Sequence, residues 1–124
     1  MELESAKLFF PFNFAKYQMP APRFIYHIVT SAELQSQDKD VFISAQLENE
    51  GFIHCSKLEQ LNGTIRRFYK AKKDLRILKI DTSLLNVPLI YEAAGDGSGF
   101  FPHVFGAISR LAITEILEPP FKFP

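Results

Sequence analysis

The three histidines of the chain occupy similar positions in its sequence. His27 lies in FIYHIVT, His54 in GFIHCS and His103 in FFPHVFG, so each is surrounded by apolar and aromatic residues. Burying a titratable ring costs free energy unless its nitrogens are hydrogen-bonded. We therefore expect the three imidazoles to line one shared pocket. A single histidine on an apolar face is more often a hydrogen-bonded core residue, and that interpretation stays open for each of them.

Two of the histidines are followed by an expected helix start. Thr30 begins the capping-box pattern Thr-Ser-Ala-Glu three residues after His27, and Ser56 begins Ser-Lys-Leu-Glu two residues after His54. A helix N-terminus presents unpaired N–H groups and a partial positive charge, which favour phosphate or carboxylate. Neutral imidazoles beside two such ends would suit a nucleotide-like or phosphorylated ligand. Thr30 and Ser56 are expected to act as N-caps in any case.

Aromatic and charged side chains could complete such a site. Tyr69 and Phe101 are candidates to stack on a ligand ring, and Arg67 is a candidate cation on the helix after His54. Glu92 closes an expected strand just before the glycine-rich loop 94–99, which makes it the best-placed carboxylate. The cations could equally form the solvated side of a helix. The loop lacks the Lys-Ser ending of a phosphate-binding loop, so a flexible turn is expected there.

Two other chemistries are weighed against this hypothesis. Three neutral histidines could form an open zinc site, but they lie 27 and 49 residues apart, and such spacing neither supports nor excludes a metal. A nucleophilic Cys55 with His54 as its base is disfavoured, because neighbouring residues of a strand point to opposite faces.

Composition predicts one folded domain in the cytoplasm. The chain has 124 residues, 47% of them hydrophobic, which is enough for a core of its own. Fourteen Lys and Arg balance fourteen Asp and Glu, which argues against a large nucleic-acid surface but leaves room for a local basic patch. The single cysteine cannot form an internal disulfide. The N-terminus lacks a basic start and an unbroken apolar stretch, so neither a signal peptide nor a membrane span is expected.

The pattern of elements predicts an α+β fold. We expect an N-terminal extension over 1–22, a single domain over 23–118 and a C-terminal tail over 119–124. Short helices are expected after Thr30 and after Ser56. Because strands outnumber helices without regular alternation, we expect a curved antiparallel or mixed sheet. Its strands are expected at 23–29, 41–47, 51–55, 74–81, 87–92, 100–105 and 111–117.

Several segments, taken in order, resemble a known bacterial family. They are FIYHIVT, EGFIHCSKLEQL, RRFYKAKKDLRILKID, LIYEAAGDGSGFFPHVFG and AISRLAI. Over Arg23 to Glu118 the chain looks like the family catalogued as domain of unknown function 952, and GFIHCS and FPHVFG are its most specific patterns. The fold of that family is described as similar to the ADP-ribosyltransferase-like fold. The resemblance therefore implies a curved, mostly antiparallel split sheet with two short helices.

The resemblance also implies roles for individual residues. Transferases of that fold place a histidine or arginine on the first core strand, against the ribose or amide of NAD, and His27 matches that position. His54, Ser56 and Tyr69 are candidates for the polar group that they use near the middle of the domain. Glu92 is the nearest equivalent of the late glutamate that stabilises positive charge as nicotinamide leaves.

Our leading hypothesis is a small cytoplasmic protein with a histidine-lined pocket for NAD, ADP-ribose or another phosphorylated ligand. If it is an ADP-ribosyl- or phosphotransferase-like enzyme, His27 would orient the ribose, and His54 and Ser56 would bind the phosphate side. Glu92 would stabilise developing positive charge, and His103 would serve in acid–base chemistry or in substrate contact. The expected ligand-binding residues are Thr30, Ser56, Arg67, Tyr69 and Phe101. Nucleic acid is expected only as a phosphorylated end. The alternatives are a non-catalytic binding or protein-interaction module and a three-histidine metal enzyme.

Overall fold

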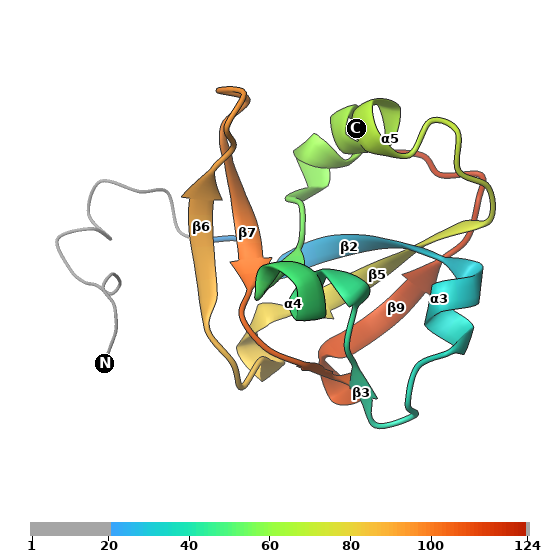
Figure 1. Ribbon diagram of the computed structural model, residues 1–124, viewed down its shortest axis with the longest axis vertical. Helices are drawn as coiled ribbons and strands as arrows, with labels where there is room; N and C mark the ends of the chain where they lie inside the picture. Colours follow the sequence, from blue (N-terminus) through green and yellow to red (C-terminus); the bar gives the residue numbers. More distant parts are fainter. Residues whose placement is uncertain (1–20, 124) are drawn as a thin grey trace, which may run out of the picture.

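The computed structural model describes residues 21–123, which form three antiparallel sheets (Figure 1). The α+β fold class is therefore confirmed. The first sheet has the order β2-β5-β9, the second has the order β4-β7-β6, and the third is the short pair β3-β8. The strands are β2 Phe24–Thr30, β3 Val41–Phe42, β4 Ile53–His54, β5 Leu75–Asp81, β6 Leu89–Ala93, β7 Phe100–Val104, β8 Ile108–Ser109 and β9 Ile113–Leu117.

Strands β2 and β5 form the centre of the fold because both of their faces are covered. All seven residues of β2 pair with β5, from Phe24 opposite Asp81 to Thr30 opposite Leu75. Side chains alternate along a strand, so Ile25 joins one apolar cluster and Ile28 joins a second. The first cluster contains Phe42 and residues of β4 and β7, so it lies on the side of β2 that faces the second sheet. This alternation also places His27 on the side of Ile25, within the protein interior.

A single backbone bridge joins the first sheet to the second. The N–H of Tyr26 donates to the carbonyl of Ser56 at 2.9 Å, and the N–H of Ser56 donates to the carbonyl of Tyr26 at 2.7 Å. The chain leaving β4 therefore contacts the middle of β2 before it turns away. The result is a split sheet in which β4 and β7 continue from one side of β2.

The helices are short, and two of them begin at a threonine or serine N-cap. Helix α3, Ser31–Gln35, is capped by Thr30, whose Oγ1 accepts from the N–H of Glu33 at 3.1 Å as predicted. The remaining helices are α4 Ala45–Glu50 and α5 Leu61–Phe68, and the 3₁₀ turns are η1 Leu58–Gln60, η2 Thr82–Leu84 and η3 Arg110–Ala112. No helix within residues 21–123 is long and apolar enough to cross a membrane.

Two local predictions were wrong. The extended segment expected over 41–47 ends at Phe42, because the buried Ser44 caps α4 by accepting from the N–H of Leu47 at 3.4 Å. Ser56 does not cap the next helix either, since its backbone is taken up by the bridge to β2. The 3₁₀ turn begins one residue later, after Lys57, whose N–H donates to Gln60 Oε1 at 2.8 Å.

The predicted terminal segments are described only in part. The extension expected over 1–22 lies outside the described residues, except for Ala21 and Pro22. In the tail, Phe121 and Phe123 pack against the second apolar cluster. The described part of the tail therefore contacts the domain.

Candidate functional site

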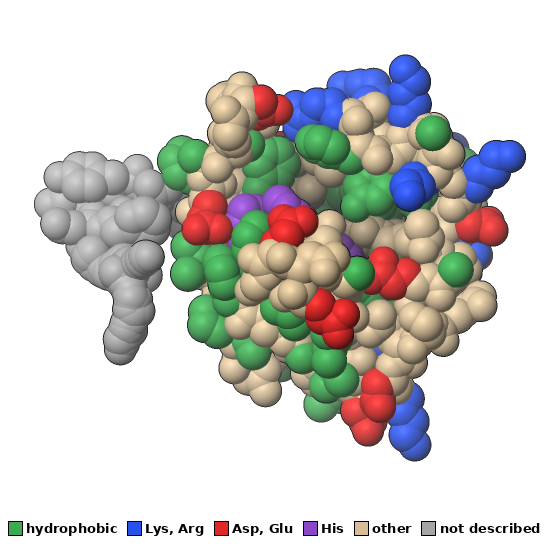
Figure 2. Space-filling model, in the orientation of Figure 1, with side chains coloured by type: hydrophobic (Ala, Val, Ile, Leu, Met, Phe, Trp, Pro, Cys, Tyr) green, Lys and Arg blue, Asp and Glu red, His purple; other side chains and the backbone are tan. Residues whose placement is uncertain are grey.

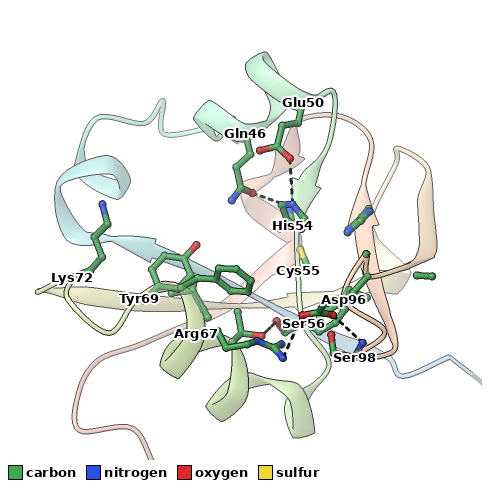
Figure 3. A pocket seen from close by; sticks show the side chains of 18 residues that line it. Gln46, Glu50, His54, Cys55, Ser56, Arg67, Tyr69, Lys72, Asp96 and Ser98 are labelled. Atoms are coloured by element: carbon green, nitrogen blue, oxygen red, sulfur yellow. Dashed lines mark hydrogen bonds and ion pairs between the residues drawn. The ribbon is translucent and has the colours of Figure 1, made fainter.

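A cavity of about 800 Å³ opens between α5 and the hairpin of β6 and β7, with α4 on a third side (Figure 3). Its floor is formed by the chain of β4 as it crosses to β2, which carries His54, Cys55 and Ser56. Figure 2 shows histidine side chains at the surface of a hollow, flanked by acidic groups. The hollow is therefore open to a ligand from solvent.

His54 and His103 meet in this cavity. They are directly paired residues of β4 and β7, so their side chains project from the same face of the sheet. Their ring centroids lie 4.7 Å apart with the planes at 85°, an edge-to-face contact. Phe52 stacks on His103 with centroids 4.1 Å apart and 17° between the planes. The two imidazoles are thus held by sheet register and by an aromatic neighbour.

Each of the two imidazoles has a carboxylate partner. His103 Nδ1 lies 2.6 Å from Glu92 Oε1, and His54 Nε2 lies 3.3 Å from Glu50 Oε1. A carboxylate accepts hydrogen bonds, so Nδ1 of His103 carries the proton and a neutral ring has its lone pair on Nε2. No residue of the described chain hydrogen-bonds that Nε2. His103 therefore has the arrangement of a general base oriented by a carboxylate.

The surroundings of His54 lower the pKa of its imidazole. Burial is the main cause that lowers the pKa of His54, and the neighbouring His103 lowers it further, against the opposing effect of Glu50. The backbone N–H of His54 donates to Gln46 Oε1 at 2.8 Å, and Figure 3 shows His54 beside Gln46 and Glu50 of α4. Two imidazoles in contact cannot both hold a proton at little cost.

His27 does not line the cavity. It is 2% exposed, its ring lies 5.3 Å from that of Phe42, and its Nδ1 lies 2.6 Å from the backbone carbonyl oxygen of His54. Burial lowers the pKa of His27, so the neutral ring donates its Nδ1 proton to that carbonyl. The structure thus brings two histidines together in the cavity and places the third behind them, where it fixes the backbone that carries His54.

This burial makes the stability of the fold depend on pH. The unfolded chain binds a proton at His27 near pH 6.5 whereas the folded state resists it, so stability is full above pH 6.5 and falls below it. In His27→Asn the amide can donate to the same carbonyl without titrating. We expect urea unfolding to show a smaller loss of stability between pH 7 and pH 5.5 in this variant than in the wild type. An unchanged pH dependence would contradict the role given to His27.

The predicted ligand-binding residues divide into two groups. Ser56, Arg67, Tyr69 and Phe101 line the cavity. Thr30 does not, since its hydroxyl caps α3. The residues that follow Thr30 and Ser56, whose N–H groups were expected to face an anion, do not line the cavity, because residues 31 and 57–60 lie outside its lining. The positive charge available to an anionic ligand therefore comes from side chains, above all Arg67 and Lys72.

Sequence reasoning missed three charged residues of the cavity. Glu50, Lys72 and Asp96 all line it, and Arg67 Nη1 lies 3.8 Å from Asp96 Oδ2 across its mouth (Figure 3). Glu50 stands four residues before His54, but Gly51 ends the helix between them in a left-handed conformation, φ 87°. The spacing of side chains on a helix therefore could not predict the contact between Glu50 and His54. The glycine after Glu50 was the one local signal, because it indicates that a helix ends there.

Neither alternative chemistry has its geometry in the described residues. Within residues 21–123, no three His, Cys, Asp or Glu side chains are close enough to hold a metal ion. The three-histidine metal site is not formed, because His27 is turned into the interior. Cys55 is 3% exposed, and burial raises the pKa of its thiol well above the usual range. A thiolate nucleophile is therefore disfavoured.

The split antiparallel sheet and its half-open cavity define a small α+β protein with one candidate site. A family model described as protein of unknown function (DUF952) matches residues 28–116, and the chain belongs to this family. It is similar to the crystal structure of protein CC0527 from Caulobacter crescentus, with 28% identity, coverage of 77% of this chain and 84% of that chain, and a TM-score of 0.68. The chain is also similar to the solution NMR structure of CC0527, with 27% identity, coverage of 78% of this chain and 84% of that chain, and a TM-score of 0.65. No curated protein matches the chain.

Proposed function

We propose that this protein binds NAD, ADP-ribose or a related phosphorylated nucleotide in the cavity and acts as an ADP-ribosyltransferase-like enzyme. The observation that carries the proposal is the 2.6 Å contact between His103 Nδ1 and Glu92 Oε1, which leaves Nε2 of His103 available as a base inside a ligand-sized cavity. Small-molecule sites usually measure about 300–1,000 Å³. The resemblance of the family to the ADP-ribosyltransferase-like fold supports the same class of ligand.

The residues around the cavity suit the parts of such a ligand. Tyr69 and Phe101 offer ring faces for a base or nicotinamide. Arg67 and Lys72 offer cations for the phosphates. The hydroxyl of Ser56 lies 3.4 Å from that of Thr64 and could donate to a ribose or phosphate oxygen. These groups would bind and orient the ligand, while His103 would act as the base in the reaction.

The reaction step proposed for His103 is a proton transfer. A nucleophile's O–H gives its proton to Nε2 of His103 as its oxygen forms a bond to C1′ of the ribose. The bond from C1′ to the nicotinamide nitrogen breaks, and its electron pair stays on that nitrogen, so nicotinamide leaves neutral. Glu92 holds Nδ1 of His103 and is therefore a positioning residue. It lies outside the lining of the cavity, so we do not assign it the oxocarbenium contact expected from the sequence.

Isothermal titration calorimetry tests the proposal. We expect heat of binding with NAD or ADP-ribose, together with a rise in the melting temperature, because a ligand that binds only the folded state stabilises it. His54→Asn should weaken binding without unfolding the domain. Absence of heat with both NAD and ADP-ribose would contradict the proposal.

A non-catalytic binding module is the second candidate. Glu50 and Asp96, the carboxylates that line the cavity, lie 3.3 Å from His54 Nε2 and 3.8 Å from Arg67 Nη1, and these contacts compete with the stabilisation of a cationic reaction centre. Glu92→Gln separates the two functions. It should lower the rate of nicotinamide release by an enzyme that uses His103 as described, and it should leave the affinity of a binding module unchanged.

Asp96 competes with an anionic ligand for Arg67. Their ion pair is exposed, and losing an exposed pair changes an equilibrium constant by at most about fivefold. We expect Asp96→Asn to bind ADP-ribose tighter by that factor in calorimetry. Adenosine, which carries no phosphate, is the control and should be unaffected. Weaker binding of ADP-ribose by Asp96→Asn would show that Asp96 itself contacts the ligand.

A further inference from the structure

The segment from the end of α5 to β5 carries an unusual concentration of positive charge. Five cations occur in the eight residues 66–73, RRFYKAKK, and all five are exposed. We call these cations, together with Phe68, the basic lip. Figure 2 shows Lys and Arg side chains gathered on the side where α5 lies in Figure 1. The cations of the basic lip are Arg66, Arg67, Lys70, Lys72 and Lys73.

The basic lip extends beyond the cavity. Arg67 and Lys72 line the cavity, but Arg66, Lys70 and Lys73 do not. A free dinucleotide inside the cavity would therefore use only part of this charge. Since the whole chain has a formal net charge of zero, the five cations mark one local surface suited to a polyanion longer than the cavity.

Phe68 provides an aromatic platform within the same surface. Its side chain is 64% exposed although it lines the cavity, and the guanidinium carbon of Arg67 lies 5.5 Å from its ring centroid. A basic surface with an exposed aromatic ring is the arrangement that binds single-stranded nucleic acid, since bases stack on the ring and phosphates pair with the cations. An acidic peptide would use the cations but has no base to stack.

We propose that the natural ligand is the end of a single-stranded nucleic acid, whose terminal nucleotide enters the cavity. The next base stacks on Phe68, and the following phosphates run along Arg66, Lys70 and Lys73. This inference rests on the proposed nucleotide binding in the cavity and names its substrate class.

Fluorescence anisotropy with a labelled ten-nucleotide RNA that carries a terminal phosphate tests the inference. We expect binding that weakens with salt, with a slope of log K against log salt of about −0.7 for each phosphate contacted. The double variant Lys70→Gln/Lys73→Gln should lose about 10-fold in affinity at 50 mM salt and make that slope shallower by about 1.4. Phe68→Ala should lose about 5- to 150-fold, the range found for base stacking.

Two controls separate this inference from the proposed function. Lys39→Gln, in the exposed loop between α3 and β3, removes one charge elsewhere and should leave RNA affinity unchanged. Calorimetry with ADP-ribose should give the same affinity for the Lys70→Gln/Lys73→Gln variant as for the wild type. If ADP-ribose binds but RNA does not, or if poly-glutamate binds as tightly as RNA, the inference is overturned and the proposed function stands. If RNA binds and neither ADP-ribose nor NAD does, the proposed function fails.

Discussion

Replacing His103 with Gln is expected to lower the rate of nicotinamide release from NAD by about 10²- to 10⁴-fold, the usual contribution of a general base. Glutamine is similar in size and its amide can donate to Glu92, but it cannot accept a proton from the attacking nucleophile. The effect should fall on kcat, with NAD affinity in calorimetry changed little. The measurement is the initial rate of nicotinamide release, followed by chromatography.

Glu92→Gln serves as the graded comparison for His103→Gln. The amide can donate to His103 as well as accept from it, so it no longer enforces the tautomer with the lone pair on Nε2. We expect a smaller loss of rate than in His103→Gln, because the ring keeps a hydrogen-bond partner but is no longer held in the tautomer that can accept a proton on Nε2. A rate for His103→Gln within twofold of the wild type would exclude His103 as the base.

Replacing Phe42 with Ala is expected to destabilise the fold by about 3–5 kcal/mol. Phe42 is fully buried in the first apolar cluster and its ring lies against that of His27, so truncation leaves a cavity beside the residue that fixes the backbone of His54. Urea unfolding measures the loss. A matched control is Ile43→Ala at the next position, where the side chain is 41% exposed and the loss should be much smaller. Equal losses at both positions would contradict the assigned core.

The sequence predicted the strands well where local pattern and final environment agree. The β-branched and aromatic residues of FIYHIVT form β2, and Thr30 caps α3, because neither depends on distant residues. The segment around Ser44 was misread because the apolar run Val-Phe-Ile before it fits a strand, whereas the serine hydroxyl caps a helix. Ser56 was misread because the bridge to Tyr26, thirty residues earlier, takes up its backbone groups.

The candidate site was also only partly predictable, because local sequence does not show how distant residues pack together. His54 and His103 lie in similar motifs, and a shared cavity was expected, but nothing local showed that strand register would pair them directly. His27 has the same kind of sequence surroundings as the other two histidines, and yet its side chain faces the core. The packing of β2 against Phe42 determines this orientation, and the local sequence does not show it. Lys72 and Asp96 enter the cavity through tertiary packing of a loop and a hairpin, which no spacing rule predicts.

Ring ¹⁵N chemical shifts of the three histidines, recorded by NMR with and without ADP-ribose, test the central claim most directly. We expect His103 in the free protein to carry its proton on Nδ1, and we expect the rings of His54 and His103 to respond to the ligand while His27 does not. A His103 proton on Nε2, or a response confined to His27, would contradict the assignment of the cavity and of its base.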